Sequence, residues 1–284
     1  CLAGGEDVVR REPRLGYNGA DGMPIREEVV ARQGDVVLTR NSYGALCLNT
    51  ADVLFVDIDD VDLERPVLGN ASVWVAGILL ALMVGVFVNL QHSPHGWLLA
   101  ALILMLTSWI GFRKGREGEL QGVQRKNQAL TRMRHRIDEF LSQHPDWRLR
   151  LYQTPGGLRL LVVHRVFTPD DPEVLSCFAA FEADPIYTRM CSRQQCFRAR
   201  VSPKPWRMGW RRGLPAALSH WPSDAATLIA RARWVADYER KANTYASCHF
   251  IEEFGQGAIH PRARAVQDWH DQLSHAQQTE RPLA

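Results

Sequence analysis

Two long apolar runs stand out in the pattern of hydrophobic and polar positions. They cover Ala71 to Leu90 and Gly96 to Phe112, carry no acidic or basic side chain, and are separated by a short polar turn. Each run falls within, or at the lower edge of, the roughly 17–25 residues that a helix needs to cross a bilayer. Two buried core helices are the alternative, but such helices rarely stay apolar on all sides for so long. The pattern therefore predicts a two-helix transmembrane hairpin over 71–112.

The positive charge around these runs predicts their orientation. Arg113, Lys114 and Arg116 follow the second run directly, whereas the turn at 91–95 contains no Lys or Arg. The positive-inside rule then places both flanks, and with them both termini, on the cytoplasmic side. We therefore expect a bacterial-type inner-membrane protein with two spans, in contact with membrane lipid.

The segments before the runs predict short strands. Apolar and alternating stretches at 35–39, 45–48 and 53–58 are typical of strands, and the last of them ends in carboxylates. Residues 1–34 are rich in Gly, Arg and Glu and show little periodicity, so we expect a loose N-terminal arm.

After the runs, the periodicity changes from helix to strand and back. Apolar positions recur three and four residues apart over 117–143, which predicts a helix. Alternation then predicts two strands at 148–153 and 158–166, joined by the Pro-Gly-Gly turn of 154–157. The remaining elements that we expect are helices at 172–183, 224–241 and 261–275 and strands at 197–201 and 245–252.

The strand at 53–58 is too short to fold by itself. We therefore expect it to pair with the strands beyond residue 147. The sequence thus predicts an α+β cytoplasmic domain with a mixed or antiparallel sheet, built from residues 35–66 and 117–284 and interrupted by the transmembrane hairpin.

Charge and cysteine content restrict the function only weakly. The formal net charge of +3 is too small to indicate nucleic-acid binding by itself. The six cysteines form no tight framework, which is typical of free thiols in a reducing compartment. Cys191 and Cys196 could hold zinc together with Cys248 or His249, but a second close pair is missing from the sequence, so no zinc is expected.

Asp57 and Asp59 are the first candidates for chemistry. They lie two residues apart on a predicted strand, so their side chains point to the same side and could share a divalent cation. The alternative is that these acids only end a buried strand at the solvent.

The hairpin from Tyr152 to Arg159 is the second candidate. A glycine-rich turn can bring backbone amides close to a phosphate, and Arg159 could clamp the phosphate. The same Pro-Gly-Gly sequence is also an ordinary way to make a tight turn.

A basic stretch interleaved with aromatic residues is the third candidate. This composition is typical of a nucleotide or nucleic-acid surface, of a surface that meets anionic lipid headgroups, or of a solvated face. The three interpretations stay open for the basic residues Arg193, Arg198, Arg200, Lys204, Arg207, Arg211 and Arg212.

These motifs together resemble a known family. A strand ending in Asp57-x-Asp59, then a helix, then a hairpin with Thr154-Pro-Gly-Gly-x-Arg159 resembles the catalytic core of the primase-polymerase domains of the archaeo-eukaryotic primase superfamily. The resemblance implies that Asp57 and Asp59 bind a metal ion, here Mg²⁺, and that Thr154, Gly157 and Arg159 bind a nucleotide. An active member would be a metal-dependent nucleotidyltransferase-like enzyme.

The chain departs from the family pattern at two points. Leu160 stands where the family has a histidine, and His164, on the same face, is about 13 Å further along a strand. The family's third acid has only one candidate, Asp184. Both departures leave an inactive member of the family as an open interpretation.

Two functional hypotheses follow from these patterns. In the first, the α+β domain binds a nucleotide or nucleic acid as an active or inactive primase-polymerase-like core. In the second, the protein is a non-enzymatic, membrane-anchored interaction protein that docks lipid or an unknown protein partner. A Cys–His dyad is not expected, because Cys248-His249 and His270-Asp271 are each neighbours in sequence and do not face each other.

Overall fold

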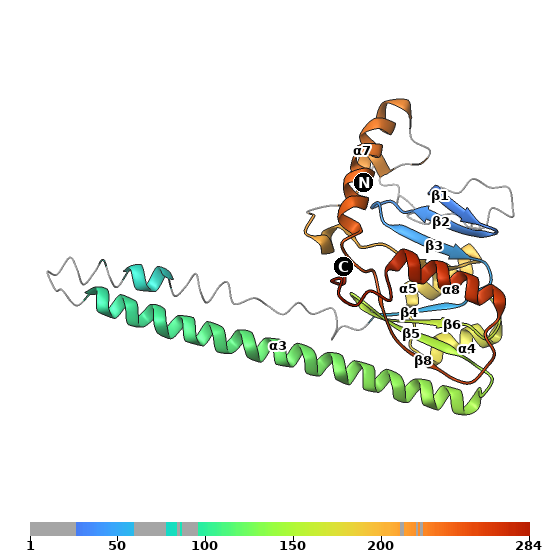
Figure 1. The fold of residues 1–284 in the computed structure, drawn as a ribbon, viewed down its shortest axis with the longest axis horizontal. Coiled ribbons are helices and arrows are strands. Elements are labelled where there is room, and N and C mark those ends of the chain that lie inside the picture. The colour runs from blue at the N-terminus through green and yellow to red at the C-terminus, as the bar shows by residue number, and fades with distance from the viewer. Residues whose placement is uncertain are drawn as a thin grey trace, which may run out of the picture. The chain divides into compact units, whose positions relative to one another are not determined.

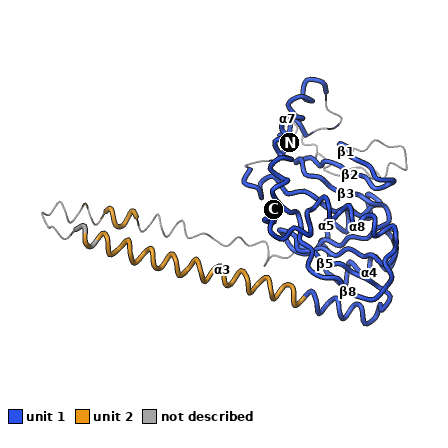
Figure 2. The backbone as a smooth tube through the Cα atoms, viewed as in Figure 1, with its two compact units in different colours: residues 1–60, 133–284 blue, residues 61–132 orange. Residues whose placement is uncertain are grey.

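The computed structural model describes residues 27–59, 78–83, 86, 96–210, 213–219, 221 and 224–284. The chain divides into two units, which are considered separately (Figure 2). Unit 1 comprises residues 1–60 and 133–284, and unit 2 comprises residues 61–132.

The first sheet of unit 1 joins the N-terminal strands to one strand from much later in the chain. Its order is β1-β2-β3-β7, and neighbouring strands are antiparallel. The strands are β1 (Glu28–Gln33), β2 (Val36–Arg40), β3 (Leu46–Thr50) and β7 (Phe197–Arg200). β1 lies inside the segment that we expected to be a loose arm, so that expectation is wrong for 28–33. The strand is held by pairing with β2 and not by an apolar pattern of its own, since none of its residues is fully buried.

The second sheet carries the two motifs that the sequence singled out. Its order is β4-β6-β5-β8, again antiparallel, with β4 (Phe55–Asp59), β5 (Leu149–Thr154), β6 (Gly157–Val162) and β8 (His249–Phe254). The expected pairing of the 53–58 strand with the strands beyond residue 147 is confirmed, because β4 pairs with β6. All six residues of β6 are buried, and all of them except Arg159 are apolar or glycine.

Helices cover both faces of this second sheet. In Figure 1, α8 lies in front of the strands and α4 and α5 lie behind them. The aspartates that precede α4 and α5 accept hydrogen bonds from the first turn, as is typical of helix N-caps. The helical segments are α4 (Pro172–Ala180), α5 (Pro185–Gln194), the 3₁₀ helix η1 (Pro205–Met208), α6 (Ala216–Ser219), α7 (Ala225–Ala242) and α8 (Pro261–Ser274).

The core of unit 1 is rich in aromatic rings. Trp147 is 1% exposed, and its ring centroid lies 4.9 Å from that of Phe140, 5.2 Å from that of Phe167 and 4.7 Å from that of His164. On the other face, His270 of α8 packs against the rings of Phe55 and Tyr152. Rings of this size dominate the burial that holds helices to a sheet.

The helix α3 (Gly96–Gln143) differs from the expectation for this region. It is one helix of 48 residues, and it joins the second apolar run to the charged segment that we expected to form a separate helix. Its C-terminal part belongs to unit 1, where Met133, Ile137 and Phe140 are buried. Its N-terminal part belongs to unit 2 and exposes large apolar side chains such as Met105.

The predicted transmembrane hairpin is wrong. No helix within the described residues combines the length and the apolar character that crossing a membrane needs. Of the first run, only 78–83 and 86 are described. The second run includes Thr107, Ser108 and Gly111 and leads directly into Arg113, so its apolar part is short beside the roughly 20 residues of a spanning helix. The finding also overturns the two-span inner-membrane localisation, with both termini cytoplasmic, that was derived from the hairpin.

Candidate functional site

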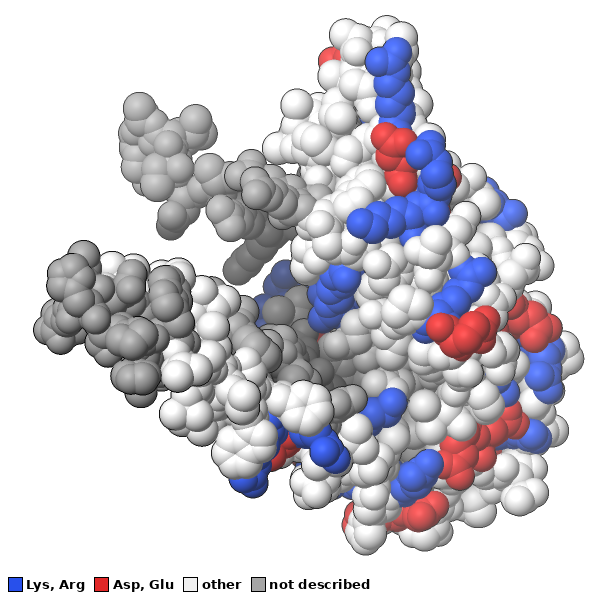
Figure 3. Space-filling view, turned by 60° about the vertical axis from the view of Figure 1, so that its left-hand side comes forward, with Lys and Arg blue, Asp and Glu red and all other residues white. Residues whose placement is uncertain are grey.

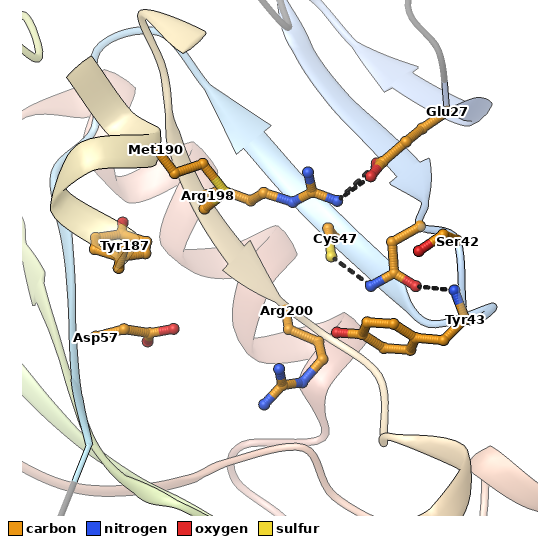
Figure 4. A pocket seen from close by; sticks show the side chains of 10 residues that line it. Glu27, Ser42, Tyr43, Cys47, Asp57, Tyr187, Met190, Arg198 and Arg200 are labelled. Atoms are coloured by element: carbon orange, nitrogen blue, oxygen red, sulfur yellow. Dashed lines mark hydrogen bonds and ion pairs between the residues drawn. The ribbon is translucent and has the colours of Figure 1, made fainter. Parts of the chain in front are cut away.

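An open cavity of about 250 Å³ lies in unit 1, where β4, β7, α5 and the loop after β2 meet (Figure 4). Asp57 lines it from β4, Arg198 and Arg200 from β7, Tyr187 from α5 and Tyr43 from the loop. Cavities that bind small molecules usually have volumes of at least about 300 Å³, so this cavity would hold only part of a larger ligand. Because the cavity is open, the rest of such a ligand can extend over the surface.

The carboxylate of Asp57 is held by a buried arginine. Asp57 and Arg159 are direct partners in the register of β4 and β6. Arg159 Nε donates to Asp57 Oδ1 at 2.6 Å and Arg159 Nη2 donates to Asp57 Oδ2 at 3.2 Å, a bidentate arrangement. Burial by itself would lower the pKa of Arg159, but the charge of Asp57, its hydrogen bonds and smaller contributions from Cys248 and Tyr187 together outweigh burial and raise the pKa above its ordinary value. Arg159 is therefore a permanent cation, although it is only 1% exposed.

A series of polar contacts extends from this ion pair through His270 and Asp271 to Arg150. Arg159 Nη1 donates to the backbone oxygen of Arg200 at 3.0 Å and lies 3.4 Å from His270 Nε2. His270 Nδ1 is 2.9 Å from Asp271 Oδ1, and Arg150 Nη2 lies 3.2 Å from Asp271 Oδ2. Burial by itself would raise the pKa of Asp271, but His270, the hydrogen bond with Tyr152 and the charge of Arg150 together outweigh burial and lower the pKa. Each charge in this series has a partner of opposite charge or a hydrogen-bond partner, which is what stable burial of charge requires.

The predicted Mg²⁺ site at Asp57 and Asp59 stays a prediction, and the residues present fit it poorly. Both oxygens of Asp57 already accept hydrogen bonds from Arg159. Two unit charges of like sign about 4 Å apart repel by about 4 kcal/mol at an effective dielectric constant of 20. A cation on Asp57 would meet this repulsion from Arg159. Asp59 is exposed at the end of β4.

The candidate for the third acid, Asp184, has a structural task. Its carboxylate accepts hydrogen bonds from the backbone N–H groups of Ile186 and Tyr187 and so caps α5. Its own backbone N–H donates to the backbone oxygen of Asp57 at 2.9 Å. In the described part of the chain, no three His, Cys, Asp or Glu side chains are grouped so that they could hold a metal ion.

The hairpin residues predicted to bind a nucleotide lie apart from the cavity. Thr154 and Gly157 pair with each other at the tip of the β5–β6 hairpin, and Gly157 is also the partner of Asp59. Neither is among the described residues that line the cavity. Only Arg159 reaches the cavity wall, and it does so through Asp57 and through the backbone of Arg200. Nucleotide contacts by Thr154 and Gly157 stay a prediction.

Two members of the basic stretch line the cavity, and they differ in their pairing. Arg198 Nη2 donates to both carboxylate oxygens of Glu27, at 2.8 and 2.6 Å. The side chain of Arg200, by contrast, makes neither a hydrogen bond nor an ion pair with any described residue. In Figure 4, Arg198 is directed toward Glu27, away from Asp57. Arg200 is therefore the cation of this cavity that a ligand can engage.

The other basic residues do not gather into one patch. Arg193 is exposed on α5, and Lys204 and Arg207 are partly buried at η1. Arg211 and Arg212 lie outside the described residues. On the face drawn in Figure 3, Lys and Arg side chains are spread over the whole face, whereas most Asp and Glu side chains lie in its lower half. At the positions that the structure describes, the predicted basic surface is thus divided between the cavity, α5 and η1.

The structure also brings together residues that sequence reasoning kept apart. Cys248, just before β8, has its Sγ 3.9 Å from Nε2 of His270 in α8, and His270 contacts Asp271 on its other side. This order resembles a nucleophile, a base and an orienting acid. Cys248 and His270 are both 0% exposed, so no substrate can reach the thiol. We assign this array to the packing of α8 on the sheet.

The cavity itself was only partly foreseeable. Tyr187 lies in α5, a helix that the sequence analysis missed although Asp184-Pro185 is a recognisable start signal for a helix. Burial raises the pKa of Tyr187, whose hydroxyl donates to the backbone oxygen of Phe55 at 3.0 Å. Tyr43 lies in a loop between two strands, and no local signal marks it.

Comparison with known proteins gives no match: no protein-family model, curated protein or solved structure matches the chain. The resemblance to primase-polymerase domains is therefore neither supported nor contradicted, and stays a prediction.

Proposed function

We propose that unit 1 is a nucleotide-binding domain that holds the phosphate groups of its ligand in the cavity between β4, β7 and α5. The observation that carries the proposal is Arg200, a partly buried cation whose side chain makes neither a hydrogen bond nor an ion pair with a described residue. A guanidinium offers several N–H donors in a fixed plane and binds phosphate oxygens in pairs.

The balance of charge around the cavity favours an anion. Glu27 is neutralised by Arg198, and Asp57 is neutralised by Arg159. Arg200 is then left as a positive charge in excess among the charged side chains that line the cavity. A ligand with phosphate groups complements this excess, whereas a cationic ligand would be repelled.

An aromatic surface beside the cavity favours a nucleotide over a bare phosphate. The ring of Trp206 is 5.2 Å from the ring of Tyr43, which lines the cavity, and Trp206 is 47% exposed. Lys204 Nζ lies 5.8 Å from the centre of the Trp206 ring. Bases stack on such rings whatever their identity, at about 1–3 kcal/mol per base. A phosphate at Arg200 with a base on Trp206 would use both features.

The proposal concerns binding. Nucleotidyl transfer, which the family resemblance implies, would need the acidic pair to be available to a metal ion, and Asp57 is engaged by Arg159. Of the two forms of the first hypothesis, an active and an inactive nucleotide-binding core, the geometry therefore supports the inactive, binding form better.

Calorimetric titration of ATP into the full chain tests the proposal. We expect wild-type protein to bind ATP, and Arg200→Met to weaken binding at least about tenfold, since hydrogen bonds to charged groups contribute about 1.5–3 kcal/mol. Arg193→Met is the matched control, because Arg193 is exposed on α5 and does not line the cavity. The control should bind within about twofold of wild type. Equal affinities of wild type and Arg200→Met, or no binding at about 1 mM ATP, would remove the proposal.

A further inference from the structure

We infer that Arg159 takes the place of a divalent cation beside Asp57, so that the cavity binds its nucleotide without a metal ion. The inference rests on the proposed function and names the form of the ligand, a nucleotide that is not complexed with Mg²⁺. Arg159 is a positioning residue in this arrangement, because its guanidinium is engaged by Asp57, the backbone oxygen of Arg200 and His270.

The first support is the geometry of the ion pair. Arg159 Nε and Nη2 approach Asp57 Oδ1 and Oδ2 at 2.6 and 3.2 Å, so the edge of the guanidinium faces the edge of the carboxylate that would bind a cation in bidentate fashion. The two strands hold this arrangement, since the residues are direct partners in the β4–β6 register. The carboxylate and the cation are therefore built into the sheet as one neutral unit.

The second support is that Arg159 is held in place from its other side. Its Nη1 donates to the backbone oxygen of Arg200 at 3.0 Å and lies 3.4 Å from His270 Nε2. The whole residue is 1% exposed. To release Asp57 for a metal ion, the guanidinium of Arg159 would have to leave its contacts with Asp57, the Arg200 backbone and His270. No solvent lies beside it to replace these contacts, so the movement would be costly for a buried cation.

The third support links Arg159 to the proposed phosphate contact. β6 belongs to one sheet and β7 to the other, and the hydrogen bond from Arg159 to the Arg200 backbone joins them. Arg159 thus fixes the position of the backbone that carries Arg200, while it cancels the charge of Asp57. With the carboxylate neutralised from within, an anion can approach Arg200 without a metal ion to screen Asp57.

Manganese binding and nucleotide binding, measured separately on the full chain, test the inference. In the absence of nucleotide, we expect wild-type protein to show no Mn²⁺ site by electron paramagnetic resonance up to about 1 mM. Arg159→Met removes the competing cation, and we expect it to gain a Mn²⁺ site that the double variant Arg159→Met/Asp57→Asn lacks. ATP should bind wild type in EDTA with an affinity within about twofold of that in Mg²⁺.

Two results would overturn the inference. One is a Mn²⁺ site in wild-type protein that is lost in Asp59→Asn, a variant of an exposed residue that should fold. The other is an ATP affinity that falls at least about tenfold when Mg²⁺ is replaced by EDTA. If ATP fails to bind under both conditions, the proposed function fails, and the Mn²⁺ titration of wild type still decides whether Arg159 excludes the metal ion. Both wild-type measurements hold even if Arg159→Met does not fold.

Discussion

The charged residues between the second sheet and α8 differ from those around the cavity in whether they have hydrogen-bond and ion-pair partners. Between this sheet and α8, a continuous series of contacts joins Arg159, His270, Asp271 and Arg150. At the cavity, Arg200 has a side chain of the same kind as Arg159 but makes neither a hydrogen bond nor an ion pair with a described residue. A buried charge with a complete set of partners is a structural group, whereas a charge left without a partner at a cavity is available to a ligand.

The largest effect should come from breaking the buried pair. Asp57→Asn leaves the Arg159 charge in the interior without its carboxylate, and we expect a loss of about 3 kcal/mol in the free energy of unfolding. Urea denaturation measures this loss. Asp59→Asn, two residues further along β4 and exposed, is the control and should change stability by less than about 0.5 kcal/mol. Equal effects of the two variants would mean that the Arg159–Asp57 pair is not a structural unit.

A smaller effect should come from a half-buried histidine outside this series. His164 packs against the rings of Trp147 and Phe167, and burial lowers its pKa to about 4 from an ordinary value of 6.5. Because the pKa of His164 is lower in the folded chain, the histidine becomes protonated in the unfolded chain before it does in the folded chain as the pH falls from 6.5 to about 4. The neutral histidine's contribution to stability is therefore complete above pH 6.5 and is lost as the pH falls to about 4.

Because His164 is only about half buried, we expect solvent screening to reduce this contribution to about 1–2 kcal/mol. Urea denaturation at a series of pH values should show a steeper loss below pH 6.5 for wild type than for His164→Phe, which keeps a ring against Trp147. Parallel pH profiles for the two proteins would show that His164 does not titrate in this way.

The smallest effect should come from the aromatic surface beside the cavity. Trp206→Ala should weaken ATP binding about fivefold, which corresponds to about 1 kcal/mol of stacking. The same variant should leave the affinity for inorganic triphosphate unchanged, because triphosphate lacks a base. Titrations with the two ligands measure the contrast. A parallel loss for both would place Trp206 in a purely structural role.

The strand pattern was more predictable than the chemistry. The runs around Val36, Leu46, Phe55 and Leu158 each gave a strand, and the turn residues located the β5–β6 hairpin. The elements β1 and α5 were missed. β1 has no apolar alternation of its own and depends on β2. The start signal of α5 is short, and no helix was predicted from it.

The two apolar runs led to the wrong prediction of a transmembrane hairpin, and the reason is physical. Their composition suits both a spanning helix and a long helix with exposed apolar side chains, and a pattern of apolar residues alone does not separate the two. The structure continues α3 through Arg113 and Lys114 to Gln143, so the end of the apolar run is not the end of the helix. Within the described residues, no helix that could cross a membrane remains.

The residues of the candidate site depend on register, which sequence does not supply. That Asp57 and Arg159 belong to paired strands could be predicted, but their direct opposition requires knowing which residues of β4 and β6 are partners. The contact of Arg159 with the Arg200 backbone joins two sheets and has no local signal at all. Arg159 was therefore identified as a phosphate ligand on its residue type, whereas its burial assigns it to the interior.

Nuclear magnetic resonance of the arginine Nε–H groups tests the central comparison most directly. With ATP added to the full chain in EDTA, the Nε–H signal of Arg200, assigned by its loss in Arg200→Met, should shift and become protected from exchange. The signal of Arg159 should already be protected without ATP and stay in place, since its Nε–H is bound to Asp57 in the free protein. A shift of the Arg159 signal with none at Arg200 would contradict the account.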